Sequence, residues 1–398
     1  MEAGKLLTIC HEPYAISNKK MKIGIDCRTI LNPKLGERAG VGHYTHYLVK
    51  NIIRYDKRNE YVLFFDWRFR DMKEFERKNV TVKNFPFSQY NKYLPFAYSH
   101  MLISAYLVKE GLDLFHSPIS SLPLTYPKKS IITVHDLAIY KNPAWFPSQI
   151  FSTKLLVPQS LRKADKIIAV SESTKKDLKH IFNVPAKKIK VIYEGATVEK
   201  IHVKNKGIDN LKRFKLWPKF ILFVGTLTPR KNIVNLIRAY KQLLKMEPGF
   251  AEYQLVLAGA KGYQNDKVFD EIKEQKLKKQ IHYLGYITHN QKMELMKKAT
   301  CFVFPSSYEG FGLPVAEAMA LGTPVITSKA SSLPEVAGKA ALLVDPEHEH
   351  EIAKAFKKVL SDKKLQARMI EKGKKQVKLF SWEKCAKETI KLYESLEK

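Results

Sequence analysis

The sequence lacks a long hydrophobic run and contains few cysteines. No stretch of eighteen consecutive apolar residues occurs among its 398 residues, so we predict no transmembrane helix. Lys5 and a short apolar patch lie near the start, but His11 and Glu12 follow too closely for a secretory signal peptide. The four cysteines show no C-x-x-C spacing, which favours reduced thiols in the cytoplasm over a disulfide framework or a zinc site.

Acidic residues are scarce relative to basic ones. Lys and Arg total 69 and Asp and Glu total 39, which gives a formal net charge of +30. A chain with this charge attracts anions such as nucleic acid, an acidic membrane or a phosphorylated substrate. Lysines spread over solvated helix faces, as in a thermophile, would give the same balance. There is no aromatic RNA-binding signature and no single stripe of lysines, so we predict no nucleic-acid partner.

Length and pattern predict an α/β protein of two domains. A hydrophobic content of 45% is ample for globular cores, and 398 residues exceed one small domain. Strand patterns alternate with helix patterns, which predicts parallel sheets flanked by helices. We expect one such domain at 21–200 and a second at 201–378. Residues 1–20 would form an N-terminal extension, and 379–398 a last helix.

The most informative stretch is 300–322, which predicts a strand, a loop and a helix. An apolar run at 301–304 is followed by the loop S-S-Y-E-G-F-G, and Pro314 suits the first turn of a helix. Loop glycines and a helix start expose backbone N–H groups, which bind anions. Glu309 in the loop and Glu317 in the helix would supply acceptors for sugar hydroxyls. The arrangement suits a phosphorylated sugar, although solvated glutamates on an ordinary turn would look similar.

Two further turns join a strand to a helix. Arg230 and Lys231 in G-T-L-T-P-R-K-N could neutralise a diphosphate leaving group without a metal, or could be solvated. We expect Asn232 to cap the helix that follows. The turn Gly40-Val41-Gly42 also precedes a helix, but it is not G-x-G-x-x-G, so we do not predict dinucleotide binding. Further on, Ser332 to Glu335 resembles a capping box.

Two histidines lie at predicted strand ends, where open parallel sheets place ligands. His116 ends one such strand, and His135 follows another in T-V-H-D-L. The segment 67–109 is rich in aromatic and basic residues. Such a segment can lie on a membrane surface, but we favour helices that pack on the sheet.

Glu309 and Glu317, with seven residues between them and G-F-G after the first, resemble the retaining glycosyltransferases of family 4. P-R-K-N and T-V-H-D-L resemble the same family, and the likeness extends over 21–398. The resemblance implies the GT-B fold, in which two Rossmann-like domains face each other across a cleft. The C-terminal half would bind a nucleotide-sugar and the N-terminal half an acceptor. The last helix would cross back to the first domain.

The resemblance also implies roles for individual residues. Glu309 would contact sugar hydroxyls and support the oxocarbenium-like charge, and Glu317 would bind ribose hydroxyls. Arg230 and Lys231 would stabilise the departing diphosphate, and His135 would contact the donor sugar through its ring or adjacent backbone. The implied catalytic set is Glu309, His135, Lys231 and Arg230. The implied donor-binding set is Gly40, Val41, Gly42, Gly225, Thr226, Arg230, Lys231, Tyr286, Ile287, Glu309, Gly310, Phe311, Gly312, Leu313 and Glu317.

The motifs G-T-L-T-P-R-K-N, S-S-L-P-E-V-A-G and V-D-P look most like bacterial mannosyltransferases that use GDP-mannose in surface polysaccharide assembly. Donors such as UDP-glucose, UDP-galactose or UDP-N-acetylglucosamine remain open. No D-x-D motif lies near a strand end, so we expect neither a metal nor a cofactor. The basic, aromatic N-terminal half fits a glycan or lipid-linked acceptor, and a cytoplasmic protein peripheral to the inner face of the plasma membrane.

Two other classes of function remain open at this point. One is a non-catalytic basic protein that binds nucleic acid or an anionic membrane. The other is an epimerase of the same fold that acts on UDP-N-acetylglucosamine. Glu309, Glu317, Arg230 and Lys231 together argue against the first class, and an epimerase would not need E-G-F-G with a second Glu at this spacing. The sequence identifies neither the acceptor, nor the linkage, nor the oligomeric state.

Overall fold

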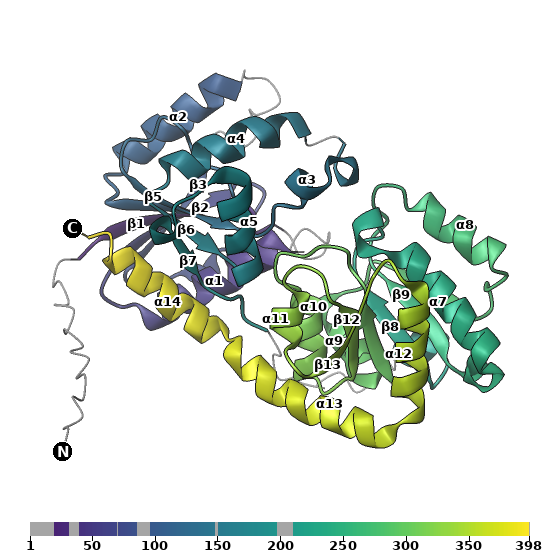
Figure 1. The fold of residues 1–398 in the computed structure, drawn as a ribbon. Coiled ribbons are helices and arrows are strands. Elements are labelled where there is room, and N and C mark those ends of the chain that lie inside the picture. The colour runs from purple at the N-terminus through teal and green to yellow at the C-terminus, as the bar shows by residue number, and fades with distance from the viewer. Residues whose placement is uncertain are drawn as a thin grey trace, which may run out of the picture.

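The computed structural model contains two α/β domains that lie side by side, and the last helical segment passes from the second domain back to the first (Figure 1). The structure describes residues 20–31, 40–69, 71–85, 96–147, 150–196 and 210–397. The predicted extension 1–20 therefore lies outside the described residues, apart from Lys20.

The first sheet has seven parallel strands in the order β3-β2-β1-β4-β5-β6-β7. Its strands are β1 (Lys22–Asp26), β2 (Glu60–Asp66), β3 (Val80–Phe85), β4 (Leu114–Ser117), β5 (Lys129–Val134), β6 (Lys166–Ala169) and β7 (Ile189–Val191). The chain changes direction across the sheet between β1 and β4. Such a switch point is where open α/β sheets bind ligands, at the carboxyl ends of the strands.

Alternate residues of the strands in this sheet enter two separate cores. On β2, Tyr61 and Leu63 belong to the core shared with α1, while Val62 and Phe64 belong to the core that includes α2 and α4. The period of two places successive side chains on opposite faces, so helices cover both faces. The helices of this domain are α1 (Val41–Tyr55), α2 (Phe96–Lys109), α3 (Ala138–Lys141), α4 (Ile150–Lys163) and α5 (Glu172–Phe182).

The second sheet has six parallel strands in the order β10-β9-β8-β11-β12-β13. The strands are β8 (Phe220–Val224), β9 (Gln254–Ala258), β10 (Ile281–Gly285), β11 (Cys301–Phe304), β12 (Val325–Ser328) and β13 (Ala341–Val344). The helices are α6 (Asn210–Arg213), α7 (Ile233–Met246), α8 (Asp266–Glu274), α9 (His289–Lys298), α10 (Leu313–Ala320), α11 (Leu333–Ala337), α12 (Glu349–Ser361) and α13 (Lys363–Gln376).

The switch point of the second sheet lies between β8 and β11, so both domains repeat one topology. The predicted fold of two Rossmann-like domains with parallel sheets is thereby confirmed. The predicted domain limits, 21–200 and 201–378, meet in a segment that lies mostly outside the described residues, and they stay predictions.

The last helix, α14 (Trp382–Glu394), packs on the first domain. The Trp382 ring stacks on Tyr47 of α1, with ring centroids 5.5 Å apart. At the other end, the Tyr393 hydroxyl lies 2.6 Å from Nδ1 of His116. His116 is fully buried at the end of β4, so it anchors α14 instead of facing a ligand.

Some local predictions were wrong. The segment 67–109 contains an edge strand, β3, besides helix α2, and only Phe85 of β3 is buried. Its mixed polar sequence hid the strand, because an edge strand needs little apolar surface. Asn232 precedes α7 with left-handed backbone angles. Its side-chain amide donates to the Pro346 carbonyl, so the side chain does not cap α7.

Candidate active site

Charged residues gather at the switch point of the second sheet. β8 is followed by Gly225, Thr226 and the short 3-10 helix η6 (Pro229–Lys231), and neighbouring β11 is followed by the loop that holds Glu309. Parallel neighbours end at the same edge of the sheet, so residues far apart in sequence meet there.

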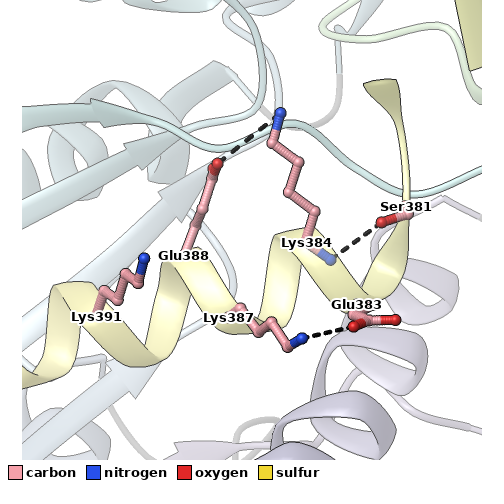
Figure 2. Close-up of a pocket in the computed structure, with 6 residues that line it drawn as sticks. All are labelled: Ser381, Glu383, Lys384, Lys387, Glu388 and Lys391. Carbon is pink, nitrogen blue, oxygen red and sulfur yellow. Dashed lines mark hydrogen bonds and ion pairs between the residues drawn. The ribbon is translucent and has the colours of Figure 1, made fainter. Parts of the chain in front are cut away.

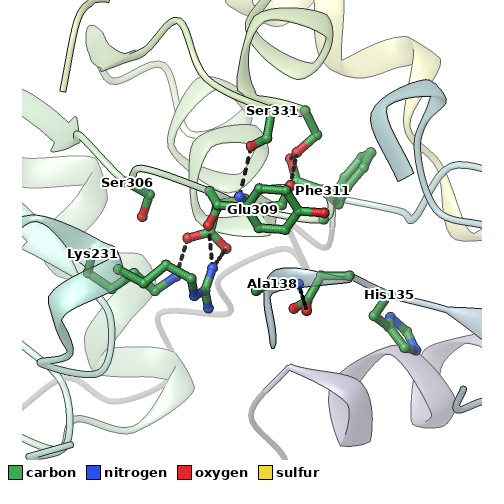
Figure 3. Close-up of polar contacts among 12 residues, drawn as sticks. His135, Ala138, Lys231, Ser306, Glu309, Phe311 and Ser331 are labelled. Carbon is green, nitrogen blue, oxygen red and sulfur yellow. Dashed lines mark hydrogen bonds and ion pairs between the residues drawn. The ribbon is translucent and has the colours of Figure 1, made fainter. Parts of the chain in front are cut away.

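Three of the predicted catalytic residues form one ion cluster (Figure 3). The Arg230 guanidinium lies 2.9 Å from Oε2 of Glu309, and Nζ of Lys231 lies 2.5 Å from Oε1. Arg230 also donates to the Tyr308 carbonyl. All three charged side chains are at most 15% exposed, so the cluster is shielded from water.

The three ion-paired side chains carry one more positive charge than negative charge, and the Asp136 carboxylate of the first domain also acts on both cations. Burial would raise the pKa of Glu309, but the charges of Arg230 and Lys231 outweigh it and lower the pKa to about 2. Burial lowers the pKa of Lys231 to about 8, Glu309 opposes this change, and Arg230 adds to it. At neutral pH both cations are charged, and the unbalanced charge attracts an anion such as a diphosphate.

The loop around Glu309 is held by two serines on the segment before α11. Oγ of Ser331 accepts a hydrogen bond of 2.8 Å from the Glu309 amide (Figure 3). The Ser332 hydroxyl lies 2.9 Å from the Glu309 carbonyl and 2.8 Å from that of Phe311. The predicted capping box at 332–335 was therefore wrong, because Ser332 supports this loop and makes no side-chain cap of α11.

Gly310 brings the two domains into direct contact. A Cβ built on it would lie 1.6 Å from the carbonyl oxygen of His135, so no larger residue fits. Oγ1 of Thr174 lies 3.3 Å from the Gly310 carbonyl and 3.4 Å from that of His135. This contact places His135 of the first domain beside the Glu309 loop (Figure 3).

Both ring nitrogens of His135 already have partners in the protein. Nδ1 lies 3.1 Å from Oε1 of Glu194, and Nε2 lies 2.9 Å from the Pro118 carbonyl. Burial would lower the pKa of His135, but the hydrogen bond and charge of Glu194 outweigh it, so the pKa is raised. To contact the donor sugar, the ring would have to give up one of these two hydrogen bonds. The backbone of His135, in contrast, already borders the site.

Glu317 does not join the Glu309 cluster. It is 1% exposed, and its two oxygens lie 2.7 and 2.8 Å from Nζ of Lys292 on α9. Gly312 precedes α10 with a φ of 105°, and Leu313 is the first residue of that helix. The Phe311 side chain is buried against Phe380, so only its backbone can reach a ligand.

The remaining predicted donor residues lie at the edges of both domains that face each other. Gly40 is the N-cap residue of α1, Val41 is the first residue of the helix, and Gly42 and His43 follow. The rings of His43 and His289 have centroids 6.0 Å apart, so the start of α1 lies near the start of α9.

The loop before α9 contains Tyr286, which is 51% exposed, and the buried Ile287. At the same edge of the sheet, Gly225 packs closely against Gly259, where a Cβ would lie 2.0 Å from the Gly225 carbonyl, and the Gly259 amide donates to the Gly285 carbonyl just before Tyr286. Thr226 follows in the same turn.

Sequence reasoning missed several residues that shape the site. The Tyr308 hydroxyl donates to Asp177 of α5 at 2.7 Å, which ties the Glu309 loop to the first domain. The Glu335 carboxylate accepts hydrogen bonds from the amides of Glu172 and Ser173 at the start of α5. Tyr308 lies inside the motif S-S-Y-E-G-F-G, but no local pattern indicates partners on a distant helix.

A surface hollow of about 330 Å³ lies along α14 (Figure 2). It is lined by Ser381, Glu383, Lys384, Lys387, Glu388 and Lys391. Lys387 pairs with Glu383 at 2.6 Å, and Lys384 lies 4.0 Å from Glu388. The hollow belongs to one helix whose charges largely pair with each other, so we assign no ligand to it.

Two family models match the chain. Glycosyltransferase Family 4 matches residues 38–200, and Glycosyl transferases group 1 matches residues 208–376. O-antigen chain mannosyltransferase B of Escherichia coli is 32% identical over 374 residues, which cover 90% of this chain and 96% of that protein. The chain is a family 4 glycosyltransferase. This membership removes the non-catalytic and epimerase alternatives.

Solved structures agree with the fold of this glycosyltransferase. Sucrose-phosphate synthase of Thermosynechococcus elongatus superposes with a TM-score of 0.74 at 24% identity, over 95% of this chain and 99% of that one. HepE of Anabaena, bound to UDP and glucose, gives a TM-score of 0.70 at 18% identity, over 94% and 100% of the two chains. At these identities the likeness supports the GT-B fold alone.

The described part of the glycosyltransferase offers no group of three His, Cys, Asp or Glu side chains that could hold a metal ion. None of its described helices is both long and apolar enough to cross a membrane. The three cysteines in the described residues, Cys27, Cys301 and Cys385, are buried and free.

Proposed function

We propose that this glycosyltransferase transfers mannose from GDP-mannose to a glycan or lipid-linked acceptor, with retention of anomeric configuration and without a metal ion. The observation that carries the proposal is the cluster of Arg230, Lys231 and Glu309 at the second switch point. The similarity to a bacterial O-antigen mannosyltransferase supports mannose as the sugar.

The cluster can serve the donor in two ways. A bound diphosphate would draw Arg230 and Lys231 toward its oxygens, because it carries more charge than one carboxylate. Glu309 would then be released to accept hydrogen bonds from sugar hydroxyls and to stabilise positive charge near C1. Glu309 would therefore face the sugar only when a bound diphosphate has drawn Arg230 and Lys231 away from it.

In the proposed transfer, Arg230 and Lys231 act on the departing diphosphate, and the retention of configuration is what the family resemblance implies. The bond between C1 and the diphosphate oxygen breaks, and the negative charge that develops on the diphosphate is stabilised by Arg230 and Lys231. The acceptor hydroxyl oxygen bonds to C1 on the same face, and its proton passes to the departing phosphate oxygen. These two side chains supply the positive charge that a metal would otherwise provide.

The first domain presents a surface that suits a lipid-linked acceptor. On α2, Met101, Leu102 and Val108 are 57%, 38% and 47% exposed, and Lys109 follows them. An exposed apolar helix face that ends in a lysine suits the boundary of an anionic bilayer, and the net charge of +30 favours the same surface. These exposed side chains support our proposal that the enzyme works at the inner face of the plasma membrane, with α2 toward the lipid.

The test is donor hydrolysis and thermal shift with GDP-mannose, UDP-glucose, UDP-N-acetylglucosamine and ADP-glucose, each in EDTA. We expect hydrolysis and stabilisation with GDP-mannose in wild type, and in Arg230→Ala a hydrolysis about 10²–10³-fold slower with a smaller stabilisation. Arg238→Ala is the matched control, because Arg238 pairs with Glu271 on α8 away from the cluster. A preference for a UDP-sugar would overturn the donor assignment, and activity that requires added metal would overturn metal independence.

A further inference from the structure

Lys292 forms an ion pair with Glu317, the carboxylate to which the family resemblance assigns the ribose hydroxyls. Its Nζ lies 2.7 Å from one oxygen of Glu317 and 2.8 Å from the other. The Glu317 side chain is 1% exposed, so no solvent cation competes for it. The Lys292 side chain is 20% exposed and stands at the edge of this buried pair.

Lys292 lies next to the segment predicted to face the base. Tyr286 and Ile287 lead into α9, where Thr288 caps the helix in a capping box with Gln291. The Lys292 amide donates to the Thr288 carbonyl at 2.9 Å, which places Lys292 one turn from that cap. A nucleoside with its base near Tyr286 and its ribose near Glu317 would therefore meet the Lys292 ammonium.

The two partners compete for the same oxygens. Ribose hydroxyls that donate to Glu317 would bond to the same two oxygens that Nζ of Lys292 now contacts, and a carboxylate that is 1% exposed leaves little room beside the ammonium. An ammonium on a flexible four-carbon stem can move toward solvent, whereas Glu317 is fixed in the middle of α10. A nucleoside thus gains the carboxylate only by breaking a buried ion pair.

We propose that Lys292 holds the ribose-binding carboxylate in the free enzyme and is displaced by the nucleoside, so that Lys292 sets the affinity for the donor. This inference rests on the proposed use of a nucleotide-sugar. Removal of the ammonium would leave Glu317 buried without its partner, and ribose hydroxyls would then bind to it more strongly.

The experiment measures the dissociation constants of GDP, UDP and ADP, and of their 2′,3′-dideoxy forms, for wild type and Lys292→Met. We expect Lys292→Met to unfold at a lower temperature than wild type and to bind the preferred ribonucleotide about tenfold more tightly. The dideoxy form should gain nothing. Lys298→Met is the matched control, because Lys298 forms an exposed pair with Glu294 on the same helix.

A second variant, Lys292→Gln, keeps a hydrogen-bond donor near Glu317 without the charge and serves if Lys292→Met does not fold. Equal or weaker ribonucleotide binding in the folded variant, with intact binding in wild type, would overturn the inference and leave the proposed function standing. An equal gain for the dideoxy form would also overturn it. If no nucleotide bound to wild type or variant, the proposed function would fail, and the inference with it.

Discussion

The switch points of the two sheets have the same topology but different side chains. In the first domain, Asp26 at the end of β1 pairs with Arg28 at 2.5 Å, so the two charges cancel. Burial lowers the pKa of neighbouring His116 to about 3, so its ring is neutral. In the second domain, Arg230 and Lys231 share Glu309 as their ion-pair partner, so the three side chains carry one net positive charge, and Asp136 of the first domain acts on both cations without an ion pair to either. The two sheets therefore provide two equivalent positions for a ligand, and we assign the diphosphate to the second because its ion-paired side chains carry a net positive charge.

The largest expected effect is on kcat, and it should distinguish removal of Arg230 at the second switch point from removal of Arg28 at the first. Arg230→Ala should lower kcat by about 10²–10³, because a donor aimed at the departing diphosphate is lost. Arg28→Ala should leave kcat unchanged and cost about 2 kcal/mol of the free energy of unfolding, since Asp26 loses its partner. Steady-state kinetics and urea unfolding of both variants measure the contrast. Equal losses of kcat would show that charge balance does not distinguish the switch points.

Glu309→Gln sharpens the comparison by removing the shared anion. The two cations would then attract diphosphate without competition, so GDP should bind about tenfold more tightly. The sugar would lose its carboxylate partner, and kcat should fall about 10²-fold. Calorimetry with GDP and initial rates with GDP-mannose measure the two changes. Weaker GDP binding in this variant would contradict the role given to Glu309 as the competing anion.

A smaller effect appears in the dependence of activity on pH. Lys231, whose pKa is lowered to about 8 by burial, loses its positive charge as the pH rises through that value. The value of kcat/KM, which reports groups of the free enzyme, should fall about tenfold per pH unit above it. Lys231→Arg keeps its charge throughout, so this alkaline fall should disappear. The same fall in both proteins would assign it to another group.

The smallest expected effect on kcat comes from a substitution at the first switch point. Tyr393→Phe removes the hydroxyl bonded to the buried His116 and should cost about 1–3 kcal/mol of the free energy of unfolding. Because this contact anchors α14 and touches no substrate, kcat should stay constant. Urea unfolding and steady-state kinetics measure both quantities. A loss of kcat without a loss of stability would assign His116 to the reaction.

Sequence predicted those features that depend on local pattern. The strand β11 begins and ends at the predicted residues 301–304, because a buried apolar run with clear breaks defines it. The motif resemblance also selected Glu309, Arg230 and Lys231, which the structure brings together although 78 residues separate Lys231 from Glu309.

The missed features depend on contacts between distant segments. Lys292 and Glu317 come from different helices, and the Glu335 carboxylate binds the start of α5 in the other domain. Ser332 and Glu335 have the spacing of a capping box, yet tertiary partners outcompete that local arrangement. The strand β3 has little apolar signal because it lies at the sheet edge. Such outcomes follow from the assembled fold, which a local pattern does not contain.

The most direct test is the affinity for GDP-mannose, measured by calorimetry in EDTA, of wild type and the double variant Arg230→Ala, Lys231→Met. We predict binding to wild type and an affinity at least about 10²-fold lower in the double variant, because both cations proposed to contact the diphosphate are gone. Equal affinity in the two proteins would contradict the claim that the second switch point binds the donor.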